Sequence, residues 1–439
     1  MENSLESLTI KRVYWRLIPF LFVLLVINYL DRVNIGFAAL RMNHELGFSA
    51  SVFGLGAGIF FIGYAVFEVP SNIMLHRVGA RLWIARIMVT WGLVSGMLAF
   101  VHTQTSFYVL RFLLGVAEAG FIPGVVAYLA FWFPVRYRSR ANAGVIMATA
   151  IASALGSPVS GVLMHTMDGS YGISGWRWML LFEAVPAVVL GLFVLVWLTY
   201  RPERAKWLAD DQRNWLVNEL AGEAAKLEKT ANLPFLKIAV MPRVWSLSAL
   251  FVCFLTAFYG VLLWLPQIIK SMGTSSDLEV GFLTALPFCC AALSMSLVSR
   301  HSDKVAERKL HIAICMVVGG VALLACAFVS QPVIGLVLLC IAAAGIWGCL
   351  AVFWTLTGEF LGGAAAAIGI ALINTIGQFG GLAGPWLVGI IKDFTGNFSM
   401  ALVVLAIAAF LAALIAFLLP DRKAAAPVGK NMMAADTAR

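Results

Sequence analysis

Twelve apolar stretches, each about 20 residues or longer, follow one another along the chain with short polar segments between them. A helix of roughly 20 apolar residues crosses the hydrocarbon core of a bilayer. Inside that core the backbone must satisfy its own hydrogen bonds, so stretches of this length predict transmembrane helices. Composition agrees, because 61% of the 439 residues are hydrophobic and only 12% are charged. The predicted spans are residues 17–38, 50–75, 82–102, 107–133, 142–166, 177–199, 244–269, 279–300, 310–330, 333–357, 364–391 and 398–419.

The longest polar interruption, residues 200–243, divides these spans six and six. The halves resemble each other, because the fourth and tenth spans both contain Phe-Trp, and the fifth and eleventh both contain a proline among small residues. Two parallel repeats around a central cavity account for this pattern. We therefore expect an all-α polytopic membrane protein with twelve transmembrane helices in two pseudo-symmetric six-helix halves. Its predicted parts are an N-terminal half (1–200), a cytoplasmic linker (201–243), a C-terminal half (244–421) and a cytoplasmic tail (422–439).

Lysine and arginine are concentrated in alternate loops, and this bias sets topology. It predicts a multi-pass protein of the inner (plasma) membrane with both termini cytoplasmic. The N-terminal apolar run has no small-residue cleavage site before it, so we expect an uncleaved first span. The net charge of +9 belongs to loops that meet anionic lipid, and we expect no nucleic-acid partner. The segment 210–229 fits either an amphipathic surface helix or a solvated linker.

Four ionisable residues lie within otherwise apolar spans: Asp31 and Arg32 in the first, Arg111 and Glu118 in the fourth. A charge at membrane depth costs about 2.5–3.5 kcal/mol on insertion scales, and such residues face a partner or a water-filled cavity. Arg111 and Glu118 are seven residues apart, so they share a helix face with Gly115 between them and a separation of roughly 10 Å. We expect the four to converge on a pathway for an anion and a proton. The alternative is a pair of salt bridges that fix helix packing.

Arginine offers a planar donor fork that matches a carboxylate, so this set suits a small organic anion. Binding of substrate to an arginine beside an acid would change the proton affinity of that acid, which couples the two without a covalent step. Weaker candidates for the substrate site are polar or aromatic residues at similar depth, each with an alternative role in helix packing: Tyr64, Trp264, Asn374 and Gln378. Glu68, Glu183 and Glu359 lie near span ends or loops and receive no assignment.

Other function classes find little support. The seven cysteines and six histidines are scattered without metal-ligand spacing, so we expect no metal and no cofactor. No nucleophile–base set lies at membrane depth, which argues against an intramembrane enzyme. A channel is disfavoured because no pore-lining motif repeats along the chain.

Three stretches carry a family resemblance: residues 28–36 (NYLDRVNIG), residues 111–120 (RFLLGVAEAG) with the following Pro123-Gly124, and residues 263–266 (LWLP). At these residues the chain resembles the major facilitator superfamily and, more narrowly, its anion:cation symporter branch. Carriers of tartrate, phthalate, sugar acids and hydroxyphenylacetate belong to that branch. The resemblance covers nearly the whole chain.

The resemblance implies roles residue by residue. Asp31 and Glu118 match acids that carry protons, Arg32 and Arg111 match positions that hold the substrate carboxylate, and Tyr64 and Asn374 match substrate-pocket positions. The loop after the second span keeps only part of the superfamily signature: Arg77, Gly79 and Arg81 fit its gating positions, but Asn72 and His76 replace the glycine and the acid. The loop after the eighth span keeps Asp303.

The expected function is therefore proton-coupled symport, in which a monomer in the lipid bilayer imports a small organic carboxylate by alternating access. An organic anion exchanger on the same fold is the alternative, and the pattern around Pro158 resembles one that is linked with antiporters. The sequence does not distinguish between tartrate, phthalate, sugar acids and aromatic acids.

Overall fold

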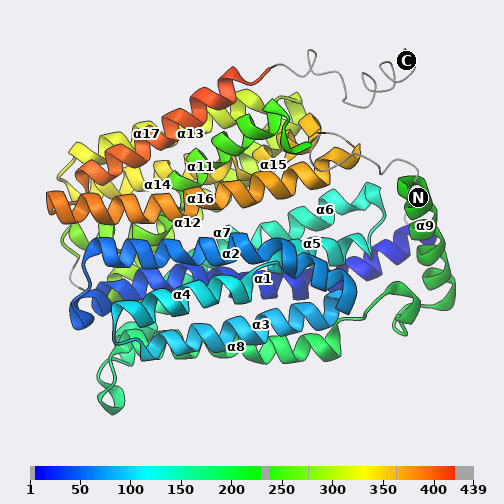
Figure 1. Cartoon of the computed structure of the whole chain (residues 1–439), viewed down its shortest axis with the longest axis horizontal. Helices are drawn as coiled ribbons and strands as arrows, with labels where there is room; N and C mark the ends of the chain where they lie inside the picture. The colour runs from blue at the N-terminus through cyan, green and yellow to red at the C-terminus, as the bar shows by residue number, and fades with distance from the viewer. Residues whose placement is uncertain (1–4, 229–237, 275, 362, 421–439) are drawn as a thin grey trace. The chain divides into compact units, whose positions relative to one another are not determined.

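The computed structural model describes residues 5–228, 238–274, 276–361 and 363–420 (Figure 1). The predicted tail 422–439 and part of the predicted linker lie outside these residues. Every regular element in the described residues is helical. The first half of the chain forms α1 (Leu5–Leu46), α2 (Ala50–Val78), α3 (Ala80–Met97), α4 (Gln104–Glu118), α5 (Phe121–Ala130), α6 (Val135–Ile146), α7 (Ala148–Thr166), α8 (Gly175–Trp197) and α9 (Asp210–Glu228). The second half forms α11 (Pro242–Ser271), α12 (Asp277–Val305), α13 (Lys309–Phe328), α14 (Pro332–Gly348), α15 (Leu350–Leu361), α16 (Gly363–Thr395) and α17 (Ser399–Leu418).

Among the described residues, ten helical segments are long and apolar enough to cross a membrane. Two of them join consecutive helices, α4 with α5 and α14 with α15. The two other predicted spans, the fifth and the eleventh, coincide with α7 and α16. Both helices contain a proline among small residues, Pro158 in α7 and Pro385 in α16. The prediction of an all-helical polytopic membrane protein is confirmed, and α9 shows that a helix forms within the predicted linker.

The chain divides into two compact units, each described here by itself. Unit 1 comprises Met1–Met42 and Ile62–Lys229, and unit 2 comprises Asn43–Phe61 and Thr230–Arg439. Within unit 1, α3 packs along α8, and within unit 2, α13 packs along α17. These are the third and sixth spans of each predicted half, so the same pairing recurs in both. Such recurrence is what a repeated six-helix architecture requires.

The first turns of α2 group with unit 2 because they pack closely on the end of α16. A Cβ atom at Gly58 would lie 2.8 Å from the carbonyl oxygen of Leu382, so glycine is required for this approach. The Asp393 carboxylate accepts hydrogen bonds from the backbone N–H groups of Ala50 (2.9 Å) and Ser51 (2.8 Å). A negative charge at a helix N-terminus satisfies donors that lack partners within the helix. Asp393 thus ties the beginning of α2 to α16.

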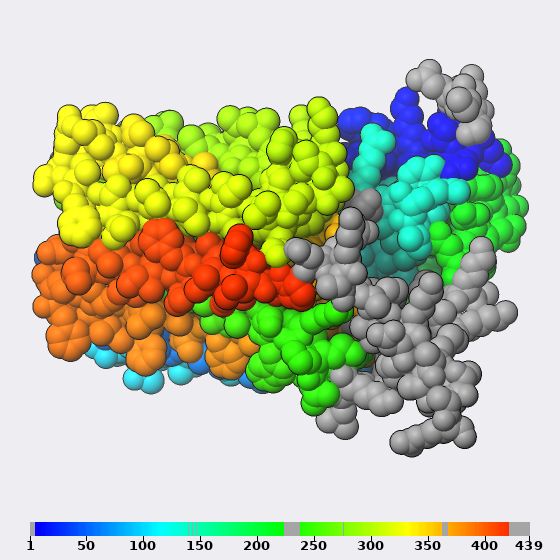
Figure 2. Space-filling view, turned by 90° about the horizontal axis from the view of Figure 1, so that it is seen from above, coloured from blue at the N-terminus to red at the C-terminus, as the bar shows by residue number. Residues whose placement is uncertain are grey.

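The outer surface of α17 is apolar, as a lipid-facing helix must be. Ile407, Leu411, Leu414 and Leu418 are all exposed and recur every three or four residues, so they form one helix face. Figure 2 shows α17, coloured orange to red, uncovered on the face of unit 2 that the view presents. This face can contact lipid along the length of the helix.

Candidate functional site

A buried ion pair joins α1 and α4 at the centre of the candidate site. The Arg32 Nε–H donates a hydrogen bond of 2.8 Å to Glu118 Oε1, and the Nη2 group of Arg32 contacts the same oxygen. Only 8% of the Arg32 side chain and 1% of the Glu118 side chain are exposed. Breaking such a pair is costly because each removed partner leaves an uncompensated buried charge. The structure therefore brings together one predicted substrate-binding residue and one predicted proton-coupling residue.

Asp31, the neighbour of Arg32, turns to a different set of partners. Its Oδ1 atom accepts hydrogen bonds from Ser95 Oγ (2.9 Å) and from Asn34 Nδ2 (3.1 Å). Its Oδ2 atom accepts one from the indole N–H of Trp91. Three donors from α1 and α3 thus surround a buried carboxyl group and satisfy its acceptors.

Arg111 and Tyr64 complete the cluster in unit 1, and both are buried. Arg111 lies on the same face of α4 as Glu118, within electrostatic range of Glu118, Arg32 and Asp31. The Arg32 guanidinium carbon lies 5.4 Å from the centre of the Tyr64 ring, within the range of a cation–π contact. The four charged residues Asp31, Arg32, Arg111 and Glu118 therefore lie close to one another within unit 1.

The helix backbone breaks directly after Glu118. α4 ends there and α5 begins at Phe121, with Gly120 at φ 83°, a left-handed conformation that favours glycine. The Ser71 hydroxyl from α2 donates a 2.6 Å hydrogen bond to the Ala119 carbonyl, which would otherwise lack a partner. Broken helices in membrane proteins occur where backbone lines a protein-enclosed or wet site. The break places Glu118 at a helix end inside the bundle.

The predicted span 107–133 corresponds to the helical segment Gln104–Ala130, and the break inside this segment was not predicted. The available signal was the Ala119-Gly120 pair followed by Pro123, since proline is tolerated in the first turn of a helix but not in its interior. The tenth span is also interrupted, at Cys349 between α14 and α15, but there the backbone keeps right-handed helical angles (φ −88°, ψ −6°).

Glu183 on α8 is a fifth buried charged residue near this cluster, to which the sequence analysis gave no role. Only 6% of the residue is exposed. Its Oε1 atom accepts a 2.7 Å hydrogen bond from Ser160 Oγ of α7, whereas Oε2 is buried and has no hydrogen-bond partner among the described residues. Asp31 of α1 lies within electrostatic range of it, and the Asn34 side chain approaches its carboxyl group. Since α8 begins at Gly175, Glu183 lies two turns inside the helix and deeper than its place in the sequence suggested.

The predicted substrate residues of unit 2 have their own surroundings. Trp264 is fully buried, donates its indole N–H to the Pro385 carbonyl at 3.0 Å, and packs edge-on against Phe53 with ring centres 5.0 Å apart. These contacts are those of a packing residue. On α16, Gln378 Nε2 approaches Asn374 Oδ1 at 3.5 Å. The roles of Trp264, Asn374 and Gln378 in substrate binding stay predictions.

The predicted gating residues occupy helix ends. Arg77 is exposed at the end of α2, and Gly79 adopts φ 98° against the Tyr200 ring, so no larger residue fits there without strain. Arg81 lies at the start of α3.

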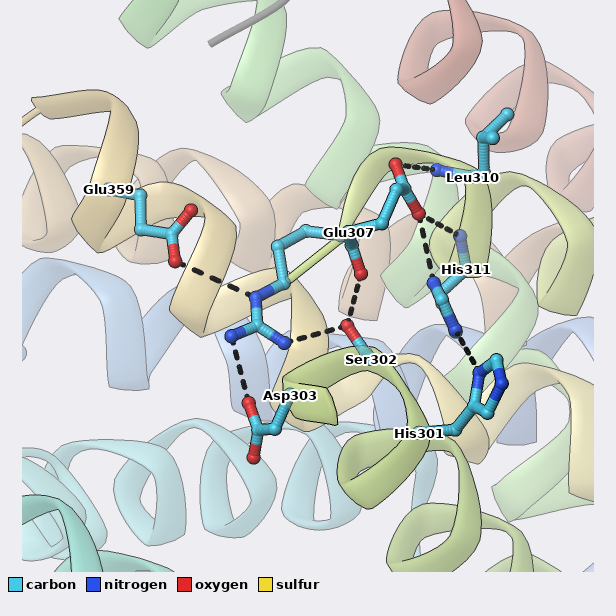
Figure 3. Close-up of polar contacts among 8 residues, drawn as sticks. His301, Ser302, Asp303, Glu307, Leu310, His311 and Glu359 are labelled. Atoms are coloured by element: carbon cyan, nitrogen blue, oxygen red, sulfur yellow. Dashed lines mark hydrogen bonds and ion pairs between the residues drawn. The ribbon is translucent and has the colours of Figure 1, made fainter. Parts of the chain in front are cut away.

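Asp303 at the end of α12 belongs to a network that Figure 3 displays. Asp303 Oδ1 pairs with Arg308 Nη2 at 2.8 Å, and Arg308 Nε lies 3.6 Å from Glu359 Oε1 on α15. Arg308 also donates to Ser302 Oγ at 2.8 Å. The network links the ends of α12 and α15 inside unit 2, so Asp303 has a local partner for its charge.

In the described part of the chain, no group of three or more His, Cys, Asp or Glu side chains is arranged to hold a metal ion. The candidate site therefore consists of charged and aromatic side chains on membrane helices.

Discontinuous membrane helices around a buried charged cluster are characteristic of secondary transporters. The chain belongs to the Major Facilitator Superfamily, whose family model matches residues 21–385 and 275–435. The expected family membership is confirmed, and the protein is a membrane transporter, not an enzyme.

Three similar proteins illustrate the range of the family. A protein of Agrobacterium vitis whose name assigns it to tartrate transport is 48% identical over 399 residues, which cover 91% of this chain and 92% of that protein. The quinolone resistance transporter of Acinetobacter baumannii is 40% identical over 402 residues, 92% of each chain. The inward-facing, unoccupied structure of a bacterial homologue of the human lysosomal transporter Spinster has a TM-score of 0.76 at 16% identity and covers 92% of this chain and 96% of that one. The last likeness concerns the fold alone.

Proposed function

We propose that the protein is a proton-coupled symporter that imports a small organic carboxylate across the inner membrane, with both termini in the cytoplasm. The single observation that carries the proposal is the buried Arg32–Glu118 pair beside Asp31 and Arg111. An intramembrane cluster of this kind is expensive to maintain, and such clusters mark substrate and proton pathways. The similarity to a protein named for tartrate transport supports a carboxylate as the substrate.

The mechanism follows from competition for one guanidinium group. In the structure both donors of Arg32 that contact Glu118 converge on a single carboxylate oxygen. A substrate carboxylate offers the same geometry, so it would replace Glu118 as the partner of Arg32. Glu118 would then lose its counter-charge in a poorly hydrated site, which favours protonation. Substrate binding and proton uptake would thus promote each other, as reciprocal coupling requires.

The test is uptake by proteoliposomes under an imposed inward proton gradient, with labelled tartrate, phthalate, hydroxyphenylacetate and hexarates. We expect one acid to accumulate above its equilibrium level only when the gradient is present. Glu118→Gln should still exchange internal for external substrate but should not accumulate it. Gradient-driven accumulation in Glu118→Gln would refute the coupling role of this residue.

An organic anion exchanger is the second candidate, because the resemblance around Pro158 points toward antiporters. An exchanger would take up labelled acid only into vesicles preloaded with acid and would ignore the proton gradient. That outcome would leave Asp31 and Glu118 with structural or gating roles.

A further inference from the structure

A basic cavity of about 290 Å³ lies in unit 1, away from the Arg32–Glu118 pair. It is formed by the beginning of α1, the start of α3, the end of α8 and the segment that leads to α9. Four cationic side chains line it: Arg16, Arg81, Arg204 and Lys206. None of the described lining residues is acidic. The cavity therefore concentrates positive charge without an internal counter-ion.

The donors in this cavity lack acceptors. Arg16 Nε, Arg81 Nε and the indole nitrogen of Trp197 are buried and have no hydrogen-bond partner in the described part of the chain. The four cations form no ion pair there, in contrast to nearby Arg136, which pairs with Glu6 at 2.7 Å. Buried donors are almost always satisfied in native proteins, so this group of unsatisfied donors points to a missing acceptor.

Contacts with aromatic side chains fix the positions of residues that line the cavity before any ligand binds. The guanidinium carbon of Arg16 lies 3.6 Å from the centre of the Trp197 ring, in stacking contact. Trp207 stacks on Trp132 with ring centres 5.4 Å apart and donates its N–H to Thr199 Oγ1 at 3.0 Å. Rigid walls reduce the entropy lost on binding, which is the advantage of preorganisation.

The positive charge of the cavity indicates which class of ligand it can bind. A phosphate diester carries one negative charge, shared by two equivalent oxygens that have further acceptor oxygens beside them, so it can engage several donors at once. Arginine forks match phosphate oxygens in a bidentate manner. The four cations and the unpaired donors thus fit the phosphate of a lipid headgroup.

The residues around the cavity indicate which kind of molecule carries the phosphate. Val189, Leu192 and Val196 form an exposed apolar stripe on α8 that ends at the cavity, and Val196 itself lines it with 80% of its surface exposed. Trp15, beside Arg16, is 68% exposed. Exposed tryptophan and basic residues at a span end are typical of the headgroup region of a membrane. We propose that this cavity binds the phosphate of an anionic phospholipid whose acyl chains lie along α8.

The experiment measures thermal unfolding of the full-length protein in neutral-detergent micelles with added phosphatidylglycerol, phosphatidylcholine or inorganic phosphate. Arg16→Gln/Arg81→Gln removes two cavity cations. Arg204→Gln/Lys206→Gln removes two exposed ones and keeps the test valid if the first variant folds poorly. Lys11→Gln/Arg12→Gln is the matched control, since it removes two exposed charges from the same part of α1 outside the cavity.

We expect phosphatidylglycerol to raise Tm in the wild type and in the control, and phosphatidylcholine to raise it far less. The phosphatidylglycerol concentration needed for half of this shift should rise at least tenfold in both cavity variants. An equal shift with inorganic phosphate alone would keep the phosphate site but overturn the lipid as its source. An absent shift, or one that the cavity variants retain in full, would overturn the proposal.

Discussion

The Arg32–Glu118 pair allows a quantitative test of how the buried charges depend on one another. Arg32→Gln removes the positive charge that faces Glu118, and Glu118→Gln replaces the charged acceptor of Arg32 by a neutral amide oxygen, while both side chains are nearly inaccessible to solvent. Removal of one partner of a buried pair costs about 3–5 kcal/mol, whereas neutral replacement of both is much less costly. The double variant should therefore be more stable than the sum of the single changes implies, with a coupling energy of about 3 kcal/mol.

The two single variants should also respond differently to pH. After Arg32→Gln, the cluster retains two acids and Arg111, and an acid can take up a proton to remove the excess negative charge. After Glu118→Gln, it retains two arginines and Asp31, and a guanidinium group keeps its charge at any ordinary pH. The cost of Arg32→Gln should therefore fall as pH is lowered, while the cost of Glu118→Gln should not.

The measurement is the free energy of unfolding of wild type, both single variants and the double variant in mixed micelles, at pH 5 and pH 8. The reasoning fails if the effects of the single changes add within about 0.5 kcal/mol, the range expected for independent sites. It also fails if Glu118→Gln, and not Arg32→Gln, is rescued at low pH. Either result would mean that Glu118 is not held as a carboxylate by Arg32.

Three further changes test separate contacts. Glu183→Gln should alter the free energy of unfolding by less than about 1 kcal/mol, because the unpartnered Oε2 fits a neutral group, and a large loss in thermal unfolding would indicate an ionised carboxylate. The backbone N–H of Gly175, helped by Arg41 and opposed by burial, holds the pKa of Asp168 below its usual value of 3.8, so its contribution to stability is present above that pH and is lost as pH falls through the lowered value. Asp168→Asn should flatten this acid-side loss in a plot of Tm against pH, and an unchanged slope would contradict the assignment. Asp393→Ala should destabilise the fold by about 0.5–2 kcal/mol, as loss of an N-terminal cap does, and an unchanged Tm would show that its contacts to α2 are dispensable.

Much of the architecture could be predicted because the bilayer restricts backbone structure so strongly. Apolar length alone located the spans, and helical periodicity placed Arg111, Gly115 and Glu118 on one face, where the structure has them. Those inferences depend only on spacing within one segment. The partners of each charge could not be read in this way, because the Arg32–Glu118 contact joins residues 86 positions apart.

The helix break after Glu118 was missed for a related reason. Ala119 and Gly120 continue the apolar run in the sequence. The break is stabilised by Ser71 of α2, whose hydroxyl group donates a hydrogen bond to the Ala119 carbonyl. Glu183 was passed over although it lies inside the predicted span 177–199, because its contact with Ser160 of α7 cannot be read from the sequence of α8 alone. In both cases the missing information was the position of a neighbouring helix.

Charge balance gives a physical reason why an anion and a proton would move together through this site. The two acids Asp31 and Glu118 balance the two bases Arg32 and Arg111 when both acids are ionised and Glu183 is neutral. The cluster is then neutral before substrate binds. A monoanionic carboxylate would bring it to one net negative charge in a medium where unbalanced charge is costly. Uptake of one proton by Glu118, the acid that loses its arginine to the substrate, restores neutrality, so the coupling that we propose needs no element beyond the charges already present.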